Sequence, residues 1–303
     1  MLIFSHRGTN REAAENTRRA FDRALEYAVD GIETDVQLSR DEVAVLWHDR
    51  FLGKLGLPGK HVDDFDYAQL QKMNIAAHFP LSNFPPMPSP QSSPASGRGG
   101  KREKQLLIPA GERANEPLRE FHANAKPESM MKLEDFLDAY HKRCRLLIEI
   151  KNRDWETPLR HEIKMRQTLE MIGARTSSLR AGERNASFPG NDPIMVSSFN
   201  LASLVYAHQY APQFPLIYNF EPEQTLDDAR RVLNEQPFLR GLCLPIESLD
   251  EPIVTLLRDH NKGIAVYTCN SDEEISRALK LGVDILISDV PQLALAIRSR
   301  FLG

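Results

Sequence analysis

Two histidines stand near the ends of short apolar runs, where side chains of this type could take part in proton transfer. His6 follows the run 2–5, and His48 ends the run 43–48. Histidine exchanges protons near neutral pH, so two histidines beside a group of carboxylates favour catalysis by a general acid and a general base. We expect His6 and His48 to be that pair, although a lone histidine more often has a structural role.

Three acidic residues, Glu33, Asp35 and Glu149, accompany the histidines. Strand ends of a barrel share one face, which would bring these carboxylates within about 5 Å, where each pair repels by roughly 3 kcal/mol. A cation must offset that repulsion, and oxygen ligands without a neighbouring cysteine favour one hard ion, Mg²⁺ or Ca²⁺, over Zn²⁺. The alternative is that Arg7 and Lys151 neutralise the acids in an ordinary network of ion pairs.

Arg7 and Lys151 are also candidate phosphate ligands. A planar guanidinium suits bidentate contact with phosphate, and an ammonium adds a second fixed positive charge. Close by in the sequence, Glu15 and Asn16 open the first predicted helix. Asn16 or Thr17 could simply cap that helix, and a supporting role for Glu15 and Asn16 behind the site residues is equally compatible.

Eight apolar or β-branched runs predict the strands that position these residues. They span residues 2–5, 31–36, 146–150, 194–197, 216–219, 241–244, 264–268 and 285–288. Stretches with helical spacing separate most of them. Strands that alternate with helices favour a parallel sheet, and eight units favour a closed barrel with its site at the carboxyl ends of the strands. We therefore expect an α/β fold, a TIM-type (β/α)8 barrel.

A ninth run, 43–48, lies too close to the second run for a parallel crossover and predicts an antiparallel hairpin. With residues 39–42 as the turn, Glu33 would pair with His48, and Asp35 with Leu46. The alternation of a strand would then place Glu33, Asp35 and His48 on one face. The other face would carry Thr34, Val36, Val45 and Trp47.

The connection from His48 to the third barrel strand is far longer than a normal strand-to-helix connection of roughly 2 to 6 residues. Residues 80–100 contain six prolines, five serines and three glycines, a composition that cannot build a core and predicts a flexible loop. We expect one barrel domain over residues 1–303, with an insertion at about 51–131 after the hairpin.

The overall composition agrees with a barrel that carries one insertion. A chain of 303 residues is long enough for a barrel of roughly 250 residues with about 50 more. The net charge of −4 argues against a protein that coats nucleic acid or an anionic membrane, so an anionic substrate must be held locally. We expect a small-molecule substrate and no stable membrane insertion; the sequence leaves the oligomeric state open.

Cys144, Cys243 and Cys269 lack the spacing of a metal site and are too few for a disulfide framework, as expected of buried thiols in a reducing compartment. The short apolar start, residues 1–4, is too short for the core of a signal peptide. These features predict a cytoplasmic location.

Taken together, the motifs resemble the glycerophosphodiester phosphodiesterase family from end to end, apart from the centre of the insertion. The matching segments are His6-Arg7-Gly8, Glu15-Asn16-Thr17, Gly31-Ile32-Glu33-Thr34-Asp35-Val36, His48-Asp49, Ile148-Glu149-Ile150-Lys151, Ser197-Ser198-Phe199 and the segment 281–289. The combination is far more specific than any one motif.

The resemblance implies hydrolysis of glycerophosphodiesters to sn-glycerol 3-phosphate and an alcohol such as choline or ethanolamine, a phosphoric diester hydrolase activity. It implies one divalent cation on the three acids, an acid–base pair formed by His6 and His48, and phosphate binding by Arg7 and Lys151. We slightly favour His6 as the base. Tyr267 stands where the family commonly has a Trp that contacts the glycerol moiety, and Ala14 stands in place of the usual Pro.

Two other functions remain open at this point. A lysophospholipase D would use the same site on substrates that keep an acyl chain, with Phe79, Phe84, Met87 and the segment 106–108 as an apolar rim or, equally, as a small core of the insertion. A non-catalytic barrel that binds phosphorylated ligands would need neither histidine. Loss of activity on chelation would exclude the non-catalytic barrel. It would also exclude a metal-free mechanism.

Overall fold

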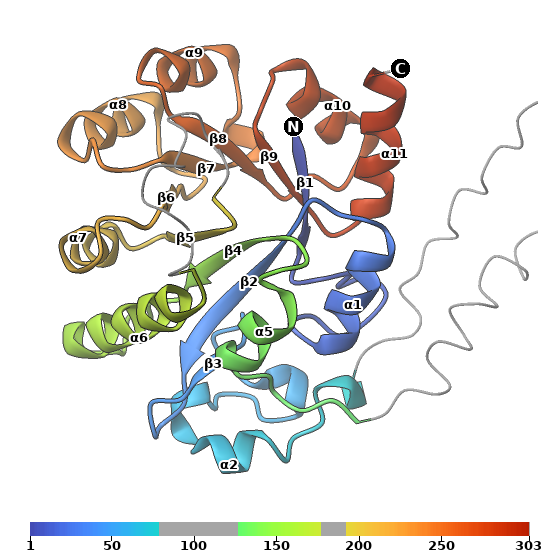
Figure 1. The fold of residues 1–303 in the computed structure, drawn as a ribbon, viewed down its shortest axis with the longest axis vertical. Coiled ribbons are helices and arrows are strands. Elements are labelled where there is room, and N and C mark those ends of the chain that lie inside the picture. The colour runs from blue at the N-terminus through green and yellow to red at the C-terminus, as the bar shows by residue number, and fades with distance from the viewer. Residues whose placement is uncertain (79–126, 177–191, 303) are drawn as a thin grey trace, which may run out of the picture. The chain divides into compact units, whose positions relative to one another are not determined.

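The computed structural model describes residues 1–78, 127–176 and 192–302, and these residues form a closed parallel barrel (Figure 1). Its strands are β1 (Leu2–His6), β2 (Gly31–Leu38), β4 (Arg145–Ile150), β5 (Ile194–Ser198), β6 (Leu216–Asn219), β7 (Gly241–Pro245), β8 (Gly263–Tyr267) and β9 (Ile285–Ser288). β1 pairs with both β9 and β2, which closes the ring. The predicted strands and the TIM-type barrel are confirmed.

Helices lie between the strands and form the outer layer (Figure 1). They are α1 (Arg18–Glu26), α5 (Leu133–Tyr140), α6 (Pro158–Thr176), α7 (Leu201–Tyr210), α8 (Leu226–Glu235), α9 (Glu251–Asp259), α10 (Asp272–Lys280) and α11 (Pro291–Leu302). Side-chain caps fix where several helices begin, because they satisfy backbone donors at the helix start. Thr17, rather than Asn16, caps α1 by accepting from the backbone N–H of Ala20.

The inward face of the barrel has two layers, which follow from the period of two in a strand. An apolar layer includes Phe4, Leu147, Met195 and Ile217, all fully buried. Two residues further along the same strands come His6, Glu149, Ser197 and Asn219, which line a pocket above that layer. The alternation therefore places a polar layer directly above an apolar floor at the carboxyl ends of the strands.

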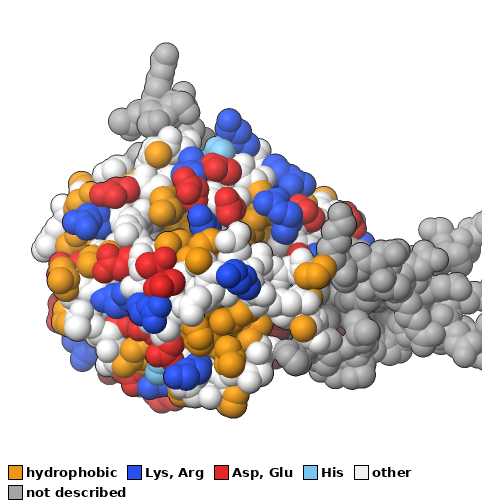
Figure 2. All heavy atoms as spheres, turned by 90° about the horizontal axis from the view of Figure 1, so that it is seen from below, with side chains coloured by type: hydrophobic (Ala, Val, Ile, Leu, Met, Phe, Trp, Pro, Cys, Tyr) orange, Lys and Arg blue, Asp and Glu red, His pale blue; other side chains and the backbone are white. Residues whose placement is uncertain are grey.

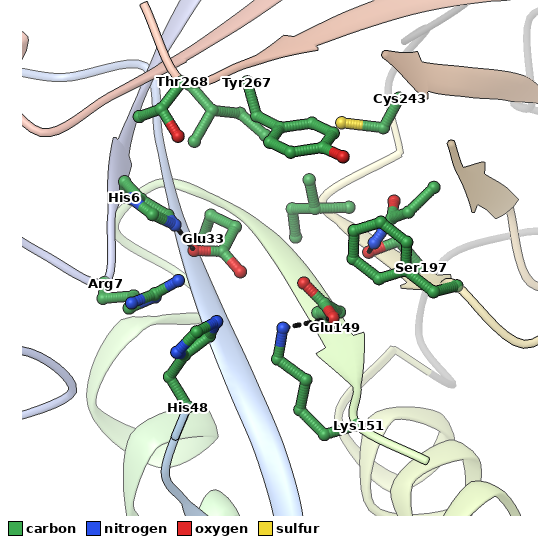
Figure 3. A pocket seen from close by; sticks show the side chains of 14 residues that line it. His6, Arg7, Glu33, His48, Glu149, Lys151, Ser197, Cys243, Tyr267 and Thr268 are labelled. Atoms are coloured by element: carbon green, nitrogen blue, oxygen red, sulfur yellow. Dashed lines mark hydrogen bonds and ion pairs between the residues drawn. The ribbon is translucent and has the colours of Figure 1, made fainter. Parts of the chain in front are cut away.

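Gly31 makes room for the floor. A Cβ at this position would lie 2.4 Å from Cζ of Phe4, far inside van der Waals contact. Phe4 and Gly31 are partners in the pairing of β1 with β2, so the Phe4 ring occupies the space that a side chain on β2 would fill. Glu33 follows two residues later on β2 and points into the pocket above the floor (Figure 3).

The antiparallel hairpin exists, but its predicted register is wrong by one residue. β3 (Ala44–Leu46) pairs with the end of β2 so that Val36 lies opposite Leu46 and Leu38 opposite Ala44. The loop is one residue shorter than the turn expected at 39–42, because the Ser39 N–H already donates to the Val43 carbonyl and Glu42 adopts a left-handed backbone with φ 61°. A three-residue loop that ends in a left-handed residue is a common hairpin connection.

The corrected register changes which side chains share a face. Val36 and Leu46 belong to the main core between strands and helices, whereas Val45 and Trp47 pack in a separate cluster. Trp47 and His48 lie beyond the end of β3, so His48 reaches the pocket from a segment outside the regular strand. The expected face shared by Val36, Val45 and Trp47 is therefore wrong.

The segment after the hairpin begins with short helical turns, Gly53–Leu55, Val62–Asp64, α2 (Tyr67–Leu70) and Ile75–His78. Leu52, Val62, Leu70 and Ile75 bury their side chains in one cluster with Val45, Trp47 and Met130. The chain divides into a barrel unit, residues 1–79 and 128–303, and a second unit, residues 80–127. The predicted loop at 80–100 lies outside the described residues, and the insertion bounds of 51–131 stay a prediction.

The side of the molecule on which α2 lies carries acidic and basic side chains interspersed with apolar ones (Figure 2). This mixture fits the small net charge. Among the described helices, each is too short or too polar to cross a bilayer. The three cysteines are free thiols.

Candidate active site

A pocket at the carboxyl ends of the barrel strands brings together the side chains predicted to do chemistry (Figure 3). It has an empty volume of about 570 Å³. His6, Arg7, Glu33, His48, Glu149, Lys151 and Tyr267 all line it, together with Leu147, Ser197, Phe199, Asn219, Cys243, Thr268 and Ile287. Asp35 lies buried directly beneath Arg7 and Lys151.

The three predicted metal ligands meet at the base of this pocket. Carboxylate oxygens of Glu33, Asp35 and Glu149 all lie within 4.8 Å of one another. One oxygen of each is buried: Oδ1 of Asp35 and Oε1 of Glu149 face the Lys151 ammonium, whereas Oε2 of Glu33 has no hydrogen bond with the described residues. Burial and the Asp35 carboxylate together raise the pKa of Glu33 well above its usual range. A group of buried acids that repel one another in this way needs a positive charge beside it.

Arg7 and Lys151 supply part of that charge. Nε of Arg7 lies 3.1 Å from Oδ2 of Asp35, and Nζ of Lys151 lies 3.2 Å from Oδ1 of Asp35 and 2.5 Å from Oε1 of Glu149. Burial alone would lower the pKa of both cations, but the carboxylates raise it, so both stay charged. The ion pairs expected under the alternative interpretation are therefore present at Asp35 and Glu149, whereas among the described residues Glu33 has a single 3.9 Å contact, with His6.

Asn16 holds Asp35 in place. Its side-chain amide donates to Oδ2 of Asp35 at 3.0 Å, and its carbonyl accepts from the Thr34 hydroxyl at 2.7 Å. Burial alone would raise the pKa of Asp35, but Lys151, Arg7 and the bond from Asn16 keep it well below its usual range. Asp35 is thus an oriented, ionised carboxylate, as a cation ligand must be.

His6 is oriented by Asp289, which follows β9. Nδ1 of His6 lies 2.6 Å from Oδ1 of Asp289, and Nε2 points to Glu33 at 3.9 Å. Asp289 also accepts from the amides of Asn10 and Asn270. A carboxylate at Nδ1 keeps the proton on that nitrogen and leaves the Nε2 lone pair facing the pocket. Burial, then the Arg7 charge, lower the pKa of His6, although Asp289 raises it. The lowered pKa favours the neutral ring.

His48 has a similar partner on the other side of the pocket. Its Nδ1 lies 2.9 Å from Oδ1 of Asp49, and Oδ2 of Asp49 lies 3.0 Å from Nζ of Lys54. The same ammonium donates to Glu15 at 2.8 Å, and Glu15 accepts from Arg7 at 3.1 Å. Burial alone would raise the pKa of Asp49, but His48 and Lys54 lower it to about 2. Glu15 therefore supports Arg7, as the sequence analysis allowed.

The turn after β1 brings Arg7 back over the barrel. Arg7 has φ 59° and Gly8 has φ 81°, both in the left-handed region. A Cβ on Gly8 would lie 2.6 Å from the backbone carbon of Ala20, so the start of α1 packs directly on this glycine. In the view of Figure 3, the Arg7 guanidinium lies between the rings of His6 and His48.

Two aromatic residues form the far wall. The rings of Tyr267 and Phe199 meet edge to face at 6.0 Å, and the Tyr267 hydroxyl donates to the Phe220 carbonyl. Lys151 Nζ lies 5.5 Å from the centre of the Phe199 ring. A second cavity opens beside this wall and shares His48, Glu149, Lys151 and Phe199 with the first.

Sequence analysis missed the roles of Asp289, Asp49 and Lys54 in this arrangement. Asp289 entered the sequence analysis only as the end of the matching segment 281–289, although an acid directly after a barrel strand is a signal that could have linked it to His6. Lys54 gave no signal, because its contacts with Glu15 and Asp49 depend on how the segment after the hairpin folds back.

A closed parallel barrel with histidines, acids and fixed cations at the carboxyl ends of its strands defines a TIM-barrel enzyme. A model of the glycerophosphoryl diester phosphodiesterase family matches residues 6–293, so the chain belongs to this family and is a phosphodiesterase.

Individual relatives agree along nearly the whole chain. Glycerophosphodiester phosphodiesterases of Bacillus altitudinis and Bacillus subtilis are 25% and 23% identical, covering 98% and 97% of this chain and 97% and 85% of theirs. The solved structure of a phosphodiesterase of Oleispira antarctica, in complex with the product sn-glycerol-3-phosphate, superposes with a TM-score of 0.70 at 18% identity over 99% of this chain and 97% of that one. This last likeness supports the fold.

Proposed function

We propose that the protein hydrolyses glycerophosphodiesters to sn-glycerol 3-phosphate and an alcohol, with a divalent cation on Glu33, Asp35 and Glu149 and with His6 and His48 as base and acid. The observation that carries this proposal is the placement of both histidines on one pocket with Glu33 and Glu149, which cluster with the buried Asp35, and each histidine is held at Nδ1 by its own aspartate. Family membership and the complex of the Oleispira relative with sn-glycerol-3-phosphate support the substrate class.

The residues present fit a hard cation. The cluster offers oxygen ligands alone, and the buried Oε2 of Glu33 has no hydrogen bond with any described residue. Carboxylates around a small hard ion are typical of Mg²⁺ and Ca²⁺. When bound, such an ion polarises a phosphoryl oxygen and offsets negative charge in the transition state.

Arg7 and Lys151 hold the phosphate in this mechanism. Their charges flank the acidic cluster, and both line the pocket wall from which a phosphate would meet the carboxylates. The carboxylates keep both side chains charged and oriented before the substrate arrives, so little reorganisation accompanies the reaction. Tyr267 and Phe199 form the wall against which the glycerol carbons would pack.

The two histidines have different environments, which supports different roles. The His6 side chain is 16% exposed against 31% for His48, and its lowered pKa favours a neutral ring with a lone pair at Nε2, suited to take a proton from the attacking oxygen of water or of a glycerol hydroxyl. His48 is partly exposed and lines both cavities, so its Nε2 can give a proton to the departing alcohol. The new P–O bond forms as the attacking oxygen loses its proton to His6. The old P–O bond breaks as the alcohol oxygen gains one from His48.

The lysophospholipase D alternative rested on apolar residues of the insertion. Phe79, Phe84, Met87 and the segment 106–108 lie outside the described residues, so no observation favours an acyl-chain site. A comparison of glycerophosphocholine with lysophosphatidylcholine as substrates separates the two activities.

Chelation followed by metal addition tests the proposal. Glycerophosphocholine hydrolysis should stop after treatment with EDTA and return with Mg²⁺ or Ca²⁺. A Glu149→Gln variant, which keeps shape and removes one ligand charge, should need a higher metal concentration for the same rate. Activity that survives chelation would exclude the metal site, and no hydrolysis of any glycerophosphodiester with metal present would exclude the substrate class.

A further inference from the structure

The second cavity beside the pocket, called here the outer chamber, borders His48, the residue proposed to protonate the departing alcohol. It has an empty volume of about 1070 Å³ and is lined by His48, Glu149, Ile150, Lys151, Asn152, Arg153, Ser198, Phe199, Asn200, Leu201 and Glu221. Of the two histidines, only His48 borders it, so a leaving group protonated by His48 would extend into this chamber. Most of its lining side chains are polar, which suits a small hydrophilic alcohol.

Most charged groups of the outer chamber are already paired. Lys151 pairs with Asp35 and Glu149. The Arg153 guanidinium donates to the His48 carbonyl and to the side chain of Gln37. The Glu221 carboxylate, in contrast, makes no hydrogen bond or ion pair with any part of the chain that the structure describes. Glu221 is therefore the charged residue of the chamber wall that remains available to a ligand.

The backbone that carries Glu221 is held in place. The preceding residue, Phe220, accepts a hydrogen bond from the Tyr267 hydroxyl, and the Glu221 N–H donates to the Gln224 side chain at 2.8 Å. Glu221 is exposed, so its carboxylate is accessible from the chamber; partial desolvation, then the Glu223 and Glu149 charges, raise its pKa, and Lys151 lowers it. The Phe199 ring adds apolar surface to the same chamber, with Lys151 Nζ 5.5 Å from the ring centre.

We infer that the outer chamber receives the alcohol part of the diester and that Glu221 makes it selective for an alcohol that carries a positive charge, a primary or quaternary ammonium. This inference rests on the proposed function and narrows it. A free carboxylate selects a cation by charge, whereas a neutral polyol gains no such contact.

A substrate pair of different charge tests the selectivity. The ratio of kcat/KM for glycerophosphocholine to that for glycerophosphoglycerol should fall by about 3- to 10-fold in Glu221→Gln. Glu223→Gln removes the same charge from the same loop outside the chamber lining, and its ratio should stay at the wild-type value. Equal ratios in the two variants would overturn the inference while leaving hydrolysis itself intact.

A binding measurement makes the test independent of turnover. Choline and 3,3-dimethyl-1-butanol have nearly the same shape and differ in charge, and ligand-observed NMR on the intact chain reports weak binding of each. Choline should bind more tightly than the neutral alcohol to the wild type, and this preference should disappear in Glu221→Gln but persist in Glu223→Gln. No preference in the wild type would overturn the inference even if no glycerophosphodiester were hydrolysed.

Discussion

Nζ of Lys54 lies 3.0 Å from Oδ2 of Asp49, the carboxylate whose other oxygen contacts Nδ1 of His48 at 2.9 Å. Lys54 belongs to the first helical turn after the hairpin. The segment that follows the hairpin therefore helps to orient a proposed catalytic histidine. Its second contact, with Glu15, extends the same support to Arg7.

Removal of the Lys54 charge should reduce turnover more than substrate binding. In Lys54→Met, Asp49 loses a partner and His48 its fixed orientation, so kcat should fall by about 10- to 100-fold with a smaller change in KM. Lys54→Arg keeps the charge and should restore most of the rate. Steady-state kinetics on both variants, with circular dichroism to confirm folding, measures the effect. A Lys54→Met enzyme within a factor of two of the wild type would contradict it.

The roles of the two histidines can be told apart by the leaving group. Alanine at either position should slow glycerophosphocholine hydrolysis by about 10²- to 10⁴-fold. A 4-nitrophenyl ester of glycerol phosphate needs no general acid, so this substrate should recover most of the rate in His48→Ala and little of it in His6→Ala. Recovery in His6→Ala instead would reverse the assignment.

On the acid side of the pH–rate profile, activity should fall at a pH below the ordinary pKa of histidine. A base must be neutral, and burial with the Arg7 charge lowers the pKa of His6, so activity should be lost only as the pH falls through a value below 6.5. Asp289 raises the pKa of His6, so Asp289→Asn should move the acid limb to still lower pH and reduce the maximum rate. The logarithm of kcat/KM plotted against pH checks both. A limb at or above pH 6.5 in the wild type would count against His6 as the base.

Loss of the amide that holds Asp35 should weaken cation binding. Asn16→Ala removes the 3.0 Å bond to Asp35 without touching the carboxylates, and partners of this kind typically contribute 10- to 100-fold in metal affinity. Thr34→Val removes only the contact between Thr34 and Asn16 and should have a smaller effect. Isothermal titration with Mg²⁺ or Ca²⁺ compares the two variants; equal affinity in Asn16→Ala and the wild type would exclude the role.

Gly31→Ala tests the barrel floor separately from the chemistry. The added methyl group meets the Phe4 ring, and such overpacking costs about 1 to 3 kcal/mol in the free energy of unfolding. Combining it with Phe4→Leu should relieve the clash. The free energy of unfolding of the double variant should then be higher than the sum of the two single effects predicts. Urea denaturation of the three variants measures the coupling; purely additive effects would show that the ring does not occupy this space.

Sequence reasoning found the residues whose positions depend on strands. Glu149 is the penultimate residue of the apolar run 146–150, and His6 directly follows the run 2–5, so the barrel topology was enough to bring them together. It failed at the hairpin register, where one left-handed residue, Glu42, shortened the loop. It also missed the bond between His6 and Asp289, which are 283 positions apart and meet only because β1 and β9 close the ring.

The two-residue alternation along the barrel strands also limits how the chain can change in length. Replacing Ser197 or Asn219 would alter the pocket wall and leave Met195 and Ile217 in the floor beneath. Deleting a single residue between the members of such a pair would turn the polar side chain outward, against the helices. Additions and losses of residues are therefore tolerated between the strands, and the long segment after β3 occupies one of these connections.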